Sequence, residues 1–83
     1  MKTIEMTGSP KSAGFKTKQT FLEKLSPFGY QHGKMKKKNN DVDILVTNDP
    51  HSSTNKMDLA KELGVDIMTY EELKDLFELE GDE

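Results

Sequence analysis

The stretch of sequence that decides the fold is residues 42–68, VDILVTNDPHSSTNKMDLAKELGVDIM. Its first part is a short apolar run that includes Leu45 and stops at the turn-forming residues 48–50. A run of this kind predicts a buried parallel strand over 42–46 that leads into a polar loop.

The second part of the stretch predicts a helix followed by another strand. Thr54 is a natural N-cap, because its side-chain oxygen can accept a hydrogen bond from the first turn of a helix. The helix is then expected over 55–63, ended by Gly64, and a short strand over 65–68. Strand, loop, capped helix and strand in this order are typical of an α/β fold.

Lys56 lies in the first turn of this predicted helix. A helix N-terminus carries about half a positive charge, so a lysine there costs roughly 0.3 kcal/mol unless an anion offsets it. The sequence therefore predicts an anion-binding site at Lys56, with phosphate as the first candidate. The alternative is a lysine that simply extends into solvent.

The rest of the chain changes its hydrophobic period from element to element. In chain order, these changes predict a strand over 2–6, a helix over 17–28 ended by Gly29, an edge strand over 30–35, a lysine-rich loop over 36–40, and a last helix that starts at the capping box Thr69-x-x-Glu72. We expect burial of Leu45, Ala60 and Ile67, and of Tyr70, Leu73, Leu76 and Phe77 in the last helix. Phe28 shares the helical spacing of Phe21, Leu22 and Leu25. An acidic tail at 79–83 is expected to be disordered.

Length and composition limit the class of protein. The 83 residues suffice for one small domain that buries about 60% of its surface. The chain has no cysteine, which excludes disulfides and thiolate metal sites, and no apolar run long enough for a transmembrane segment or a signal peptide. We therefore expect a soluble, monomeric, intracellular protein.

Charge divides the chain into two halves. Residues 1–40 hold nine lysines against Glu5 and Glu23, a balance of +7, and residues 41–83 hold three lysines against thirteen acids, a balance of −10. The basic half is suited to a polyanion such as nucleic acid. Its cluster of lysines at 34–38 is typical of a solvated loop, with a nucleic-acid contact or a nuclear import signal as the alternatives.

Several short motifs in a fixed order carry a family resemblance. They are KTIEMTG at 2–8, Phe28-Gly29, Lys37-Lys38, DILV at 43–46, the helix start at 56–60, and LGVDI at 63–67. With them the chain resembles the BRCT domain over residues 2–78, and it is most similar to the single C-terminal module of bacterial NAD-dependent DNA ligases. It departs from the family pattern in having Gly29-Tyr30 in place of Gly-Gly, and Leu73 where many members place an aromatic residue.

The resemblance implies a fold. Residues 1–78 would form one compact BRCT-like α/β domain, with a four-stranded parallel sheet of order 2-1-3-4. The first and third helices would cover one face and the second helix the other. Ligands of open α/β sheets bind beyond the carboxyl ends of the strands at a topological switch point, here between the first and third strands.

The resemblance also implies site residues. The phosphate-binding positions of the family match Thr7, Gly8 and Lys56. A threonine hydroxyl, a glycine backbone that can be approached closely and a lysine are chemically suited to that ligand. The residues expected to contact DNA are Ser9, Lys16, Lys18, Lys37 and Lys38. A turn at Thr7-Gly8 is also a common way to end a strand in any protein.

Other kinds of site find little support. His32 and His51 are far apart in sequence, so we expect an exposed strand residue and a loop residue and no metal site. Asp49 is not accompanied by the acidic pair of a receiver domain. No catalytic triad, carboxylate pair or phosphate-cradling glycine loop occurs. We therefore expect no enzyme activity and no cofactor.

The resulting expectation is a non-catalytic module that binds a phosphate-bearing partner, and the resemblance implies that it serves as a fragment or accessory domain of a DNA ligase. The first candidate is the 5′-phosphate of a DNA end or nick in replication or repair. The expected compartment is the cytoplasm, for a bacterial or phage protein that associates with the nucleoid, with the nucleus as the alternative. A phosphoprotein reader and a phosphate-independent scaffold between two proteins are the alternative functions.

Overall fold

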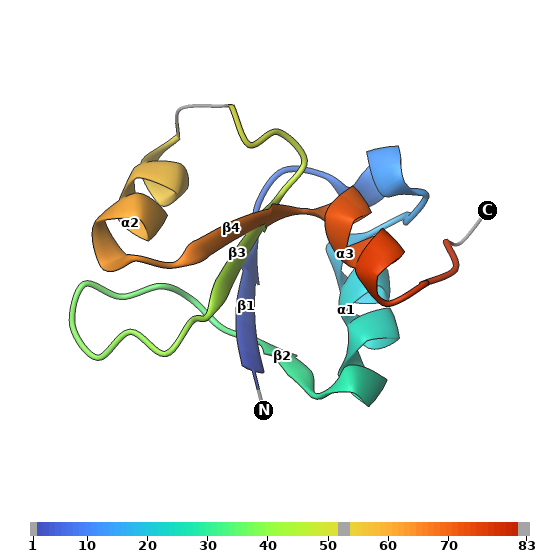
Figure 1. Ribbon diagram of the computed structural model, residues 1–83, viewed down its shortest axis with the longest axis horizontal. Helices are drawn as coiled ribbons and strands as arrows, with labels where there is room; N and C mark the ends of the chain where they lie inside the picture. The colour runs from blue at the N-terminus through green and yellow to red at the C-terminus, as the bar shows by residue number, and fades with distance from the viewer. Residues whose placement is uncertain (1, 52–53, 82–83) are drawn as a thin grey trace.

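The computed structural model describes residues 2–51 and 54–81, and within them four parallel strands form one sheet (Figure 1). The strands are β1 (Lys2–Met6), β2 (Tyr30–His32), β3 (Ile44–Thr47) and β4 (Asp66–Thr69), in the spatial order β2-β1-β3-β4. The predicted fold class and strand order are confirmed. β1 is central because its pairing runs to β2 on one side and to β3 on the other.

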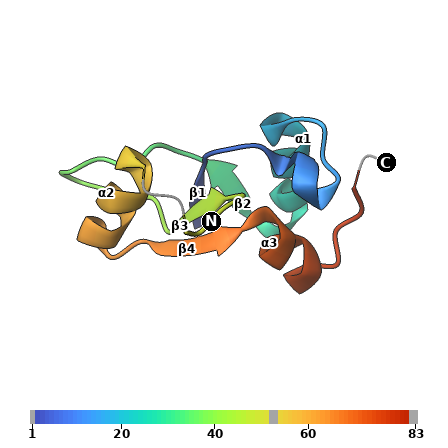
Figure 2. The same ribbon diagram turned by 90° about the horizontal axis from the view of Figure 1, so that it is seen from above.

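Three α-helices cover the two faces of the sheet: α1 (Lys18–Leu25), α2 (Asn55–Leu63) and α3 (Tyr70–Leu76). Figure 2 shows α1 and α3 together at one side of the molecule and α2 at the other. Short 3₁₀ turns precede and follow α1, η1 at Pro10–Ala13 and η2 at Ser26–Phe28. None of the helices in the described ranges is long and apolar enough to cross a lipid bilayer.

Threonine N-caps begin all three α-helices. The hydroxyl oxygens of Thr17, Thr54 and Thr69 each accept a hydrogen bond from the backbone N–H three residues later. At the start of α3, the Thr69 N–H in turn donates to Glu72 Oε1 at 3.1 Å, so the predicted capping box is confirmed. These caps satisfy N–H groups that have no partner inside the helix.

The sheet separates two apolar core clusters. On one face, Ile4, Met6, Ile44 and Val46 pack with residues of α1, α3 and η1; on the other, Leu45 packs with Met35, Val42, Met57, Ala60 and Val65. Adjacent strand residues reach opposite clusters because successive side chains of a strand point to opposite faces. Thr3 and Glu5 therefore face the α2 side of the sheet, where both are buried.

Tyr70 joins α3 to the carboxyl end of β1. Its side chain is fully buried, its ring lies edge-on to Phe21 at 4.9 Å, and its hydroxyl donates to the Thr7 carbonyl at 2.9 Å. Burial raises the pKa of the Tyr70 phenol well above its ordinary value, because an apolar environment disfavours the charged form. The donor that holds Thr7 is thus protonated at neutral pH.

Two residues of the predicted helical apolar patterns are exposed. Leu76 is 63% exposed at the end of the seven-residue α3, and Phe28 is 49% exposed. Phe28 belongs to a 3₁₀ turn with three residues per turn, so the α-helical spacing that placed it in the core does not apply there. Its ring contacts Phe77 instead, with 4.7 Å between the ring centroids. Ile67 is partly buried against the second core cluster.

Strand boundaries also differ from the prediction. β2 ends at His32, three residues early, and Gly33 follows it in close contact with β1. A Cβ at Gly33 would lie 2.3 Å from Thr3 Cγ2, so a larger residue does not fit. β3 begins at Ile44 and not at residue 42. Hydrophobic pattern alone does not fix where pairing stops.

The chain after α3 continues along the first core cluster. Leu79 is partly buried against that cluster, and its N–H donates to the Lys74 carbonyl at 2.9 Å. Gly81 lies against the backbone of Gly14. The predicted disordered tail thus contains an apolar residue that packs, while residues 82–83 lie outside the described residues.

Candidate anion-binding site

The strand register leaves an opening beside the carboxyl end of β1. β2 pairs with β1 only as far as Ile4 opposite His32, whereas β3 continues to pair with Glu5 and Met6. On the side of β1 that faces β2, its last two residues therefore have no paired strand residue opposite them. A cleft of about 420 Å³ lies there. Its size falls within the range of small-ligand pockets.

The cleft brings together residues from both faces of the sheet. It is lined by Glu5, Met6, Lys18, His32, Lys34, Met35, Lys56 and Leu59. Lys18 is the first residue of α1, Lys34 follows β2, and Lys56 is in the first turn of α2. Three lysines and one carboxylate give the cleft an excess of positive charge. Such a cleft attracts anions.

Glu5 offsets the charge that the sequence placed in the first turn of α2. Lys56 Nζ lies 3.4 Å from Glu5 Oε2, and the two side chains are 50% and 7% exposed respectively. The anion that offsets the Lys56 charge in this structure is therefore the Glu5 carboxylate of the same chain. Sequence reasoning missed it, because Glu5 occupies an ordinary polar position in an alternating strand and is buried only once α2 covers that face.

The same carboxylate fixes the segment after β2. Glu5 Oε1 accepts a hydrogen bond from the Met35 N–H at 2.7 Å, and the Met35 side chain is buried in the second core cluster. Lys34 directly precedes Met35 in the chain, and it lines the cleft. Glu5 thus contacts both the segment that carries Lys34 and the helix that carries Lys56.

The predicted phosphate-binding turn lies at the end of β1, next to β3. The Thr7 N–H donates to the Val46 carbonyl at 2.8 Å, and the Thr7 carbonyl accepts from Tyr70. Gly8 has φ +74°, and an added Cβ would lie 1.9 Å from Asn48 Oδ1, so this position requires glycine. Thr7 and Gly8 do not line the cleft. Of the three predicted phosphate-binding residues, Lys56 does.

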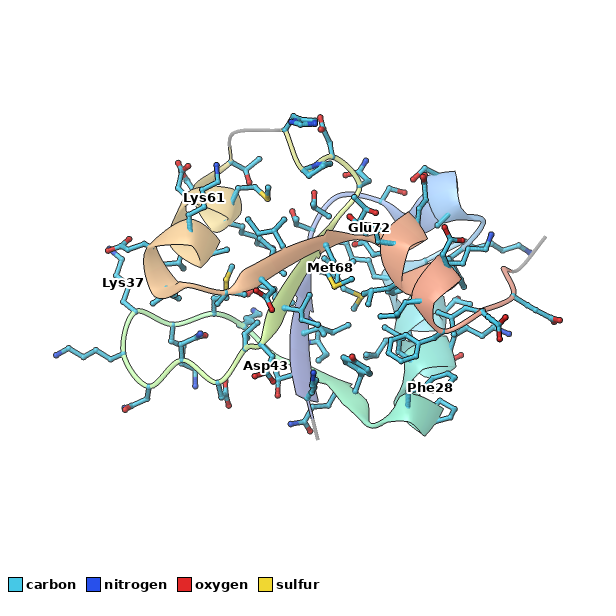
Figure 3. All side chains as sticks on the ribbon, viewed as in Figure 1. Phe28, Lys37, Asp43, Lys61, Met68 and Glu72 are labelled. Carbon is cyan, nitrogen blue, oxygen red and sulfur yellow. The ribbon has the colours of Figure 1, made fainter. Side chains whose placement is uncertain are left out.

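The predicted DNA-contacting residues are distributed around the molecule. Lys18 lines the cleft, and Lys16 is exposed just before α1. The Ser9 hydroxyl accepts from the Lys11 N–H at 3.3 Å and so caps η1. Lys37 and Lys38 are exposed on the loop between β2 and β3, outside the cleft lining, and Figure 3 labels Lys37 there. Part of the predicted switch-point loop, residues 52–53, lies outside the described residues.

Both histidines occupy the predicted kinds of position. His32 ends the edge strand β2 and is exposed, and His51 is exposed in a turn where its N–H donates to Asp49 Oδ1 at 2.9 Å. Within residues 2–51 and 54–81, no group of three histidine, aspartate or glutamate side chains is arranged to hold a metal ion.

No protein-family model, curated protein or solved structure matches the chain.

Proposed function

We propose that this chain is a non-catalytic recognition module for a phosphate-bearing partner, and that the partner is a DNA end or nick with a 5′-phosphate. The observation that carries the proposal is the convergence of Lys18, Lys34 and Lys56 on one cleft from three different elements. Lysines spread over a surface bind counterions weakly, whereas lysines that face one cavity can contact a single phosphate together.

The position of the cleft suits a large ligand. It opens at an edge strand, and all three of its lysines are exposed. A terminal phosphate of a macromolecule can therefore reach the lysines while the rest of the ligand stays outside. Met6, Met35 and Leu59 supply apolar lining, which lowers the local dielectric constant and strengthens a charge-assisted hydrogen bond.

Lysines outside the cleft favour DNA over a phosphorylated protein. Lys36, Lys37 and Lys38 follow Lys34 on the same loop, and all are exposed. The DNA backbone presents further phosphates beside its terminal one, and such lysines can neutralise them. The resemblance to the ligase type of BRCT domain supports a role in replication or repair, as an accessory to a ligase in the cytoplasm.

The test is an NMR titration against two hairpin duplexes that differ only in a 5′-phosphate or a 5′-hydroxyl. We expect the phosphorylated duplex to bind more tightly and to shift the amide signals of Met35 and its neighbours. Lys34→Ala should weaken that binding about 3- to 10-fold. Lys61→Ala is the matched control, because Lys61 is an exposed lysine of α2 that does not line the cleft (Figure 3). Equal binding of the two duplexes by the wild type would refute the proposal.

A scaffold between two proteins is the second candidate, and exposed apolar side chains favour it. Phe28 and Leu76 are the large apolar residues that the described chain leaves most exposed. Binding of a protein partner that is lost in Phe28→Ala, and that is nearly independent of salt, would favour this candidate. DNA binding through the lysines should weaken steeply, because log K falls by about 0.9 per log salt for each phosphate neutralised.

A further inference from the structure

The most unusual charged group in the structure is the Glu5 carboxylate. The Glu5 side chain is only 7% exposed on an inner strand, yet it lines a cleft whose other charged residues are lysines. Burying a carboxylate costs several kcal/mol unless it is paired. An apolar residue at this position would avoid that cost but would leave the buried Met35 N–H without its acceptor. The Met35 contact needs an oxygen and not a charge, so the charge of Glu5 is left to be explained by the cleft.

Each Glu5 oxygen has one identified partner, and the two partners differ in kind. Oε1 accepts from the Met35 backbone N–H at 2.7 Å, which is a fixed part of the loop. Oε2 lies 3.4 Å from Lys56 Nζ, at the end of a flexible and half-exposed side chain. The first contact resists change, because the Met35 side chain is buried, and the second can be exchanged. A ligand anion can replace Glu5 at Lys56 while Met35 stays in place.

We propose that Glu5 is an internal competitor for Lys56 that sets the anion affinity of the cleft. In the free protein, Glu5 offsets the repulsion among the lysines and holds Lys56 at the cleft wall. A phosphate that enters the cleft has to share Lys56 with Glu5 or displace it, and is itself repelled by the carboxylate. This inference rests on the proposed phosphate-binding role of the cleft and adds the residue that limits its affinity.

The size of the effect follows from Coulomb's law. Consider a ligand charge about 6 Å from the Glu5 carboxylate, at an effective dielectric constant of about 40, between that of a protein surface and that of water. The repulsion then corresponds to about a tenfold loss of affinity per unit charge. Salt screening reduces this figure and the second charge of a phosphate monoester increases it, so about tenfold is the expected change at low salt.

The first test compares Glu5→Gln with the wild type. Glutamine keeps an oxygen for the Met35 N–H and removes the charge. Asp43→Asn is the matched control: Asp43 Oδ2 accepts from the Thr3 N–H at 3.0 Å, so this variant also removes one negative charge from a hydrogen-bonded carboxylate, but outside the cleft lining (Figure 3). The probes are inorganic pyrophosphate and the 5′-phosphorylated duplex, titrated by NMR at low salt.

We expect Glu5→Gln to bind both probes about tenfold more tightly and Asp43→Asn to bind them as the wild type does. A residue with a structural role alone would not raise affinity when it is replaced. In a Lys56→Met background the repulsion remains, so Glu5→Gln should still gain about tenfold there, and any larger gain with Lys56 present measures the competition for that lysine. Equal or weaker binding by Glu5→Gln, or the same gain from Asp43→Asn, would overturn the inference.

A measurement on the wild type keeps the inference testable if Glu5→Gln does not fold. Saturating pyrophosphate should shift the Glu5 carboxyl carbon resonance and leave the hydrogen-exchange protection of the Met35 amide unchanged. A Glu5 carboxyl resonance that does not shift would refute the replacement of Glu5 by the ligand anion at Lys56. The two proposals also fail separately: equal binding of phosphorylated and hydroxyl duplexes removes the DNA-end function, whereas the role of Glu5 is decided by pyrophosphate.

Discussion

Replacing Lys56 by methionine should destabilise the domain, although the residue is half-exposed and unfavourably placed for the helix dipole. The change leaves the Glu5 side chain, 7% exposed, without the cation at 3.4 Å. Breaking a fully buried ion pair costs about 3 to 5 kcal/mol, and an exposed pair contributes about 0.2 to 1 kcal/mol. This pair lies between these cases, so its loss should cost about 1 to 2 kcal/mol.

The helix dipole reduces this cost only slightly. Removing a lysine from the first turn of α2 relieves roughly 0.3 kcal/mol, and methionine keeps the apolar stem of the side chain. We therefore expect Lys56→Met to lose about 0.7 to 1.7 kcal/mol of unfolding free energy. In a domain of this size, that loss lowers Tm by about 5 to 10 °C.

The assay is urea and thermal denaturation of the wild type, Lys56→Met, Glu5→Gln and the double variant. The double variant should be nearly as stable as Glu5→Gln, because the lysine then has no carboxylate to pair with. A coupling energy of at least about 1 kcal/mol is expected from the cycle. Lys61→Met, in the last turn of the same helix, is the control and should cost no more than about 0.5 kcal/mol. A Lys56→Met variant as stable as the wild type would refute the reasoning.

Three further predictions concern the core, the link to β1 and the cleft. Leu45→Ala should cost about 2 to 5 kcal/mol in urea denaturation, because Leu45 is fully buried in the second core cluster; a cost below about 1 kcal/mol would contradict that burial. Because burial raises the pKa of Tyr70, its neutral form contributes stability that is complete below pH about 10 and is lost as the pH rises further. In a Tyr30→Phe variant, where Tyr70 is the remaining tyrosine, tyrosinate absorbance should accordingly appear at alkaline pH only with unfolding. Lys18→Ala should reduce the salt dependence of duplex binding by about one phosphate, or about 0.9 in slope, and an unchanged slope would remove Lys18 from the interface.

The sequence by itself determined the type of each helix and strand and their order along the chain. Local signals were sufficient where they depend on neighbouring residues: the Thr54 cap, the Thr69 capping box, and Gly64 in a left-handed conformation at the end of α2. The resemblance then supplied the strand order. Local signals did not predict which apolar side chains are buried, because burial depends on packing between distant elements. Phe28 and Leu76 are as apolar as core residues and yet are exposed.

The tertiary structure alone decided where a site could form. The register that stops β2 at His32 opens the cleft on the outer side of β1, and no local pattern encodes where that pairing ends. The sequence predicted an anion at Lys56, with phosphate as the first candidate. Only folding showed that Glu5 supplies one, because the two residues are 51 positions apart and meet when α2 packs over the sheet. Glu5 becomes the partner of Lys56 because it is buried beside that lysine, and its burial depends on the whole fold.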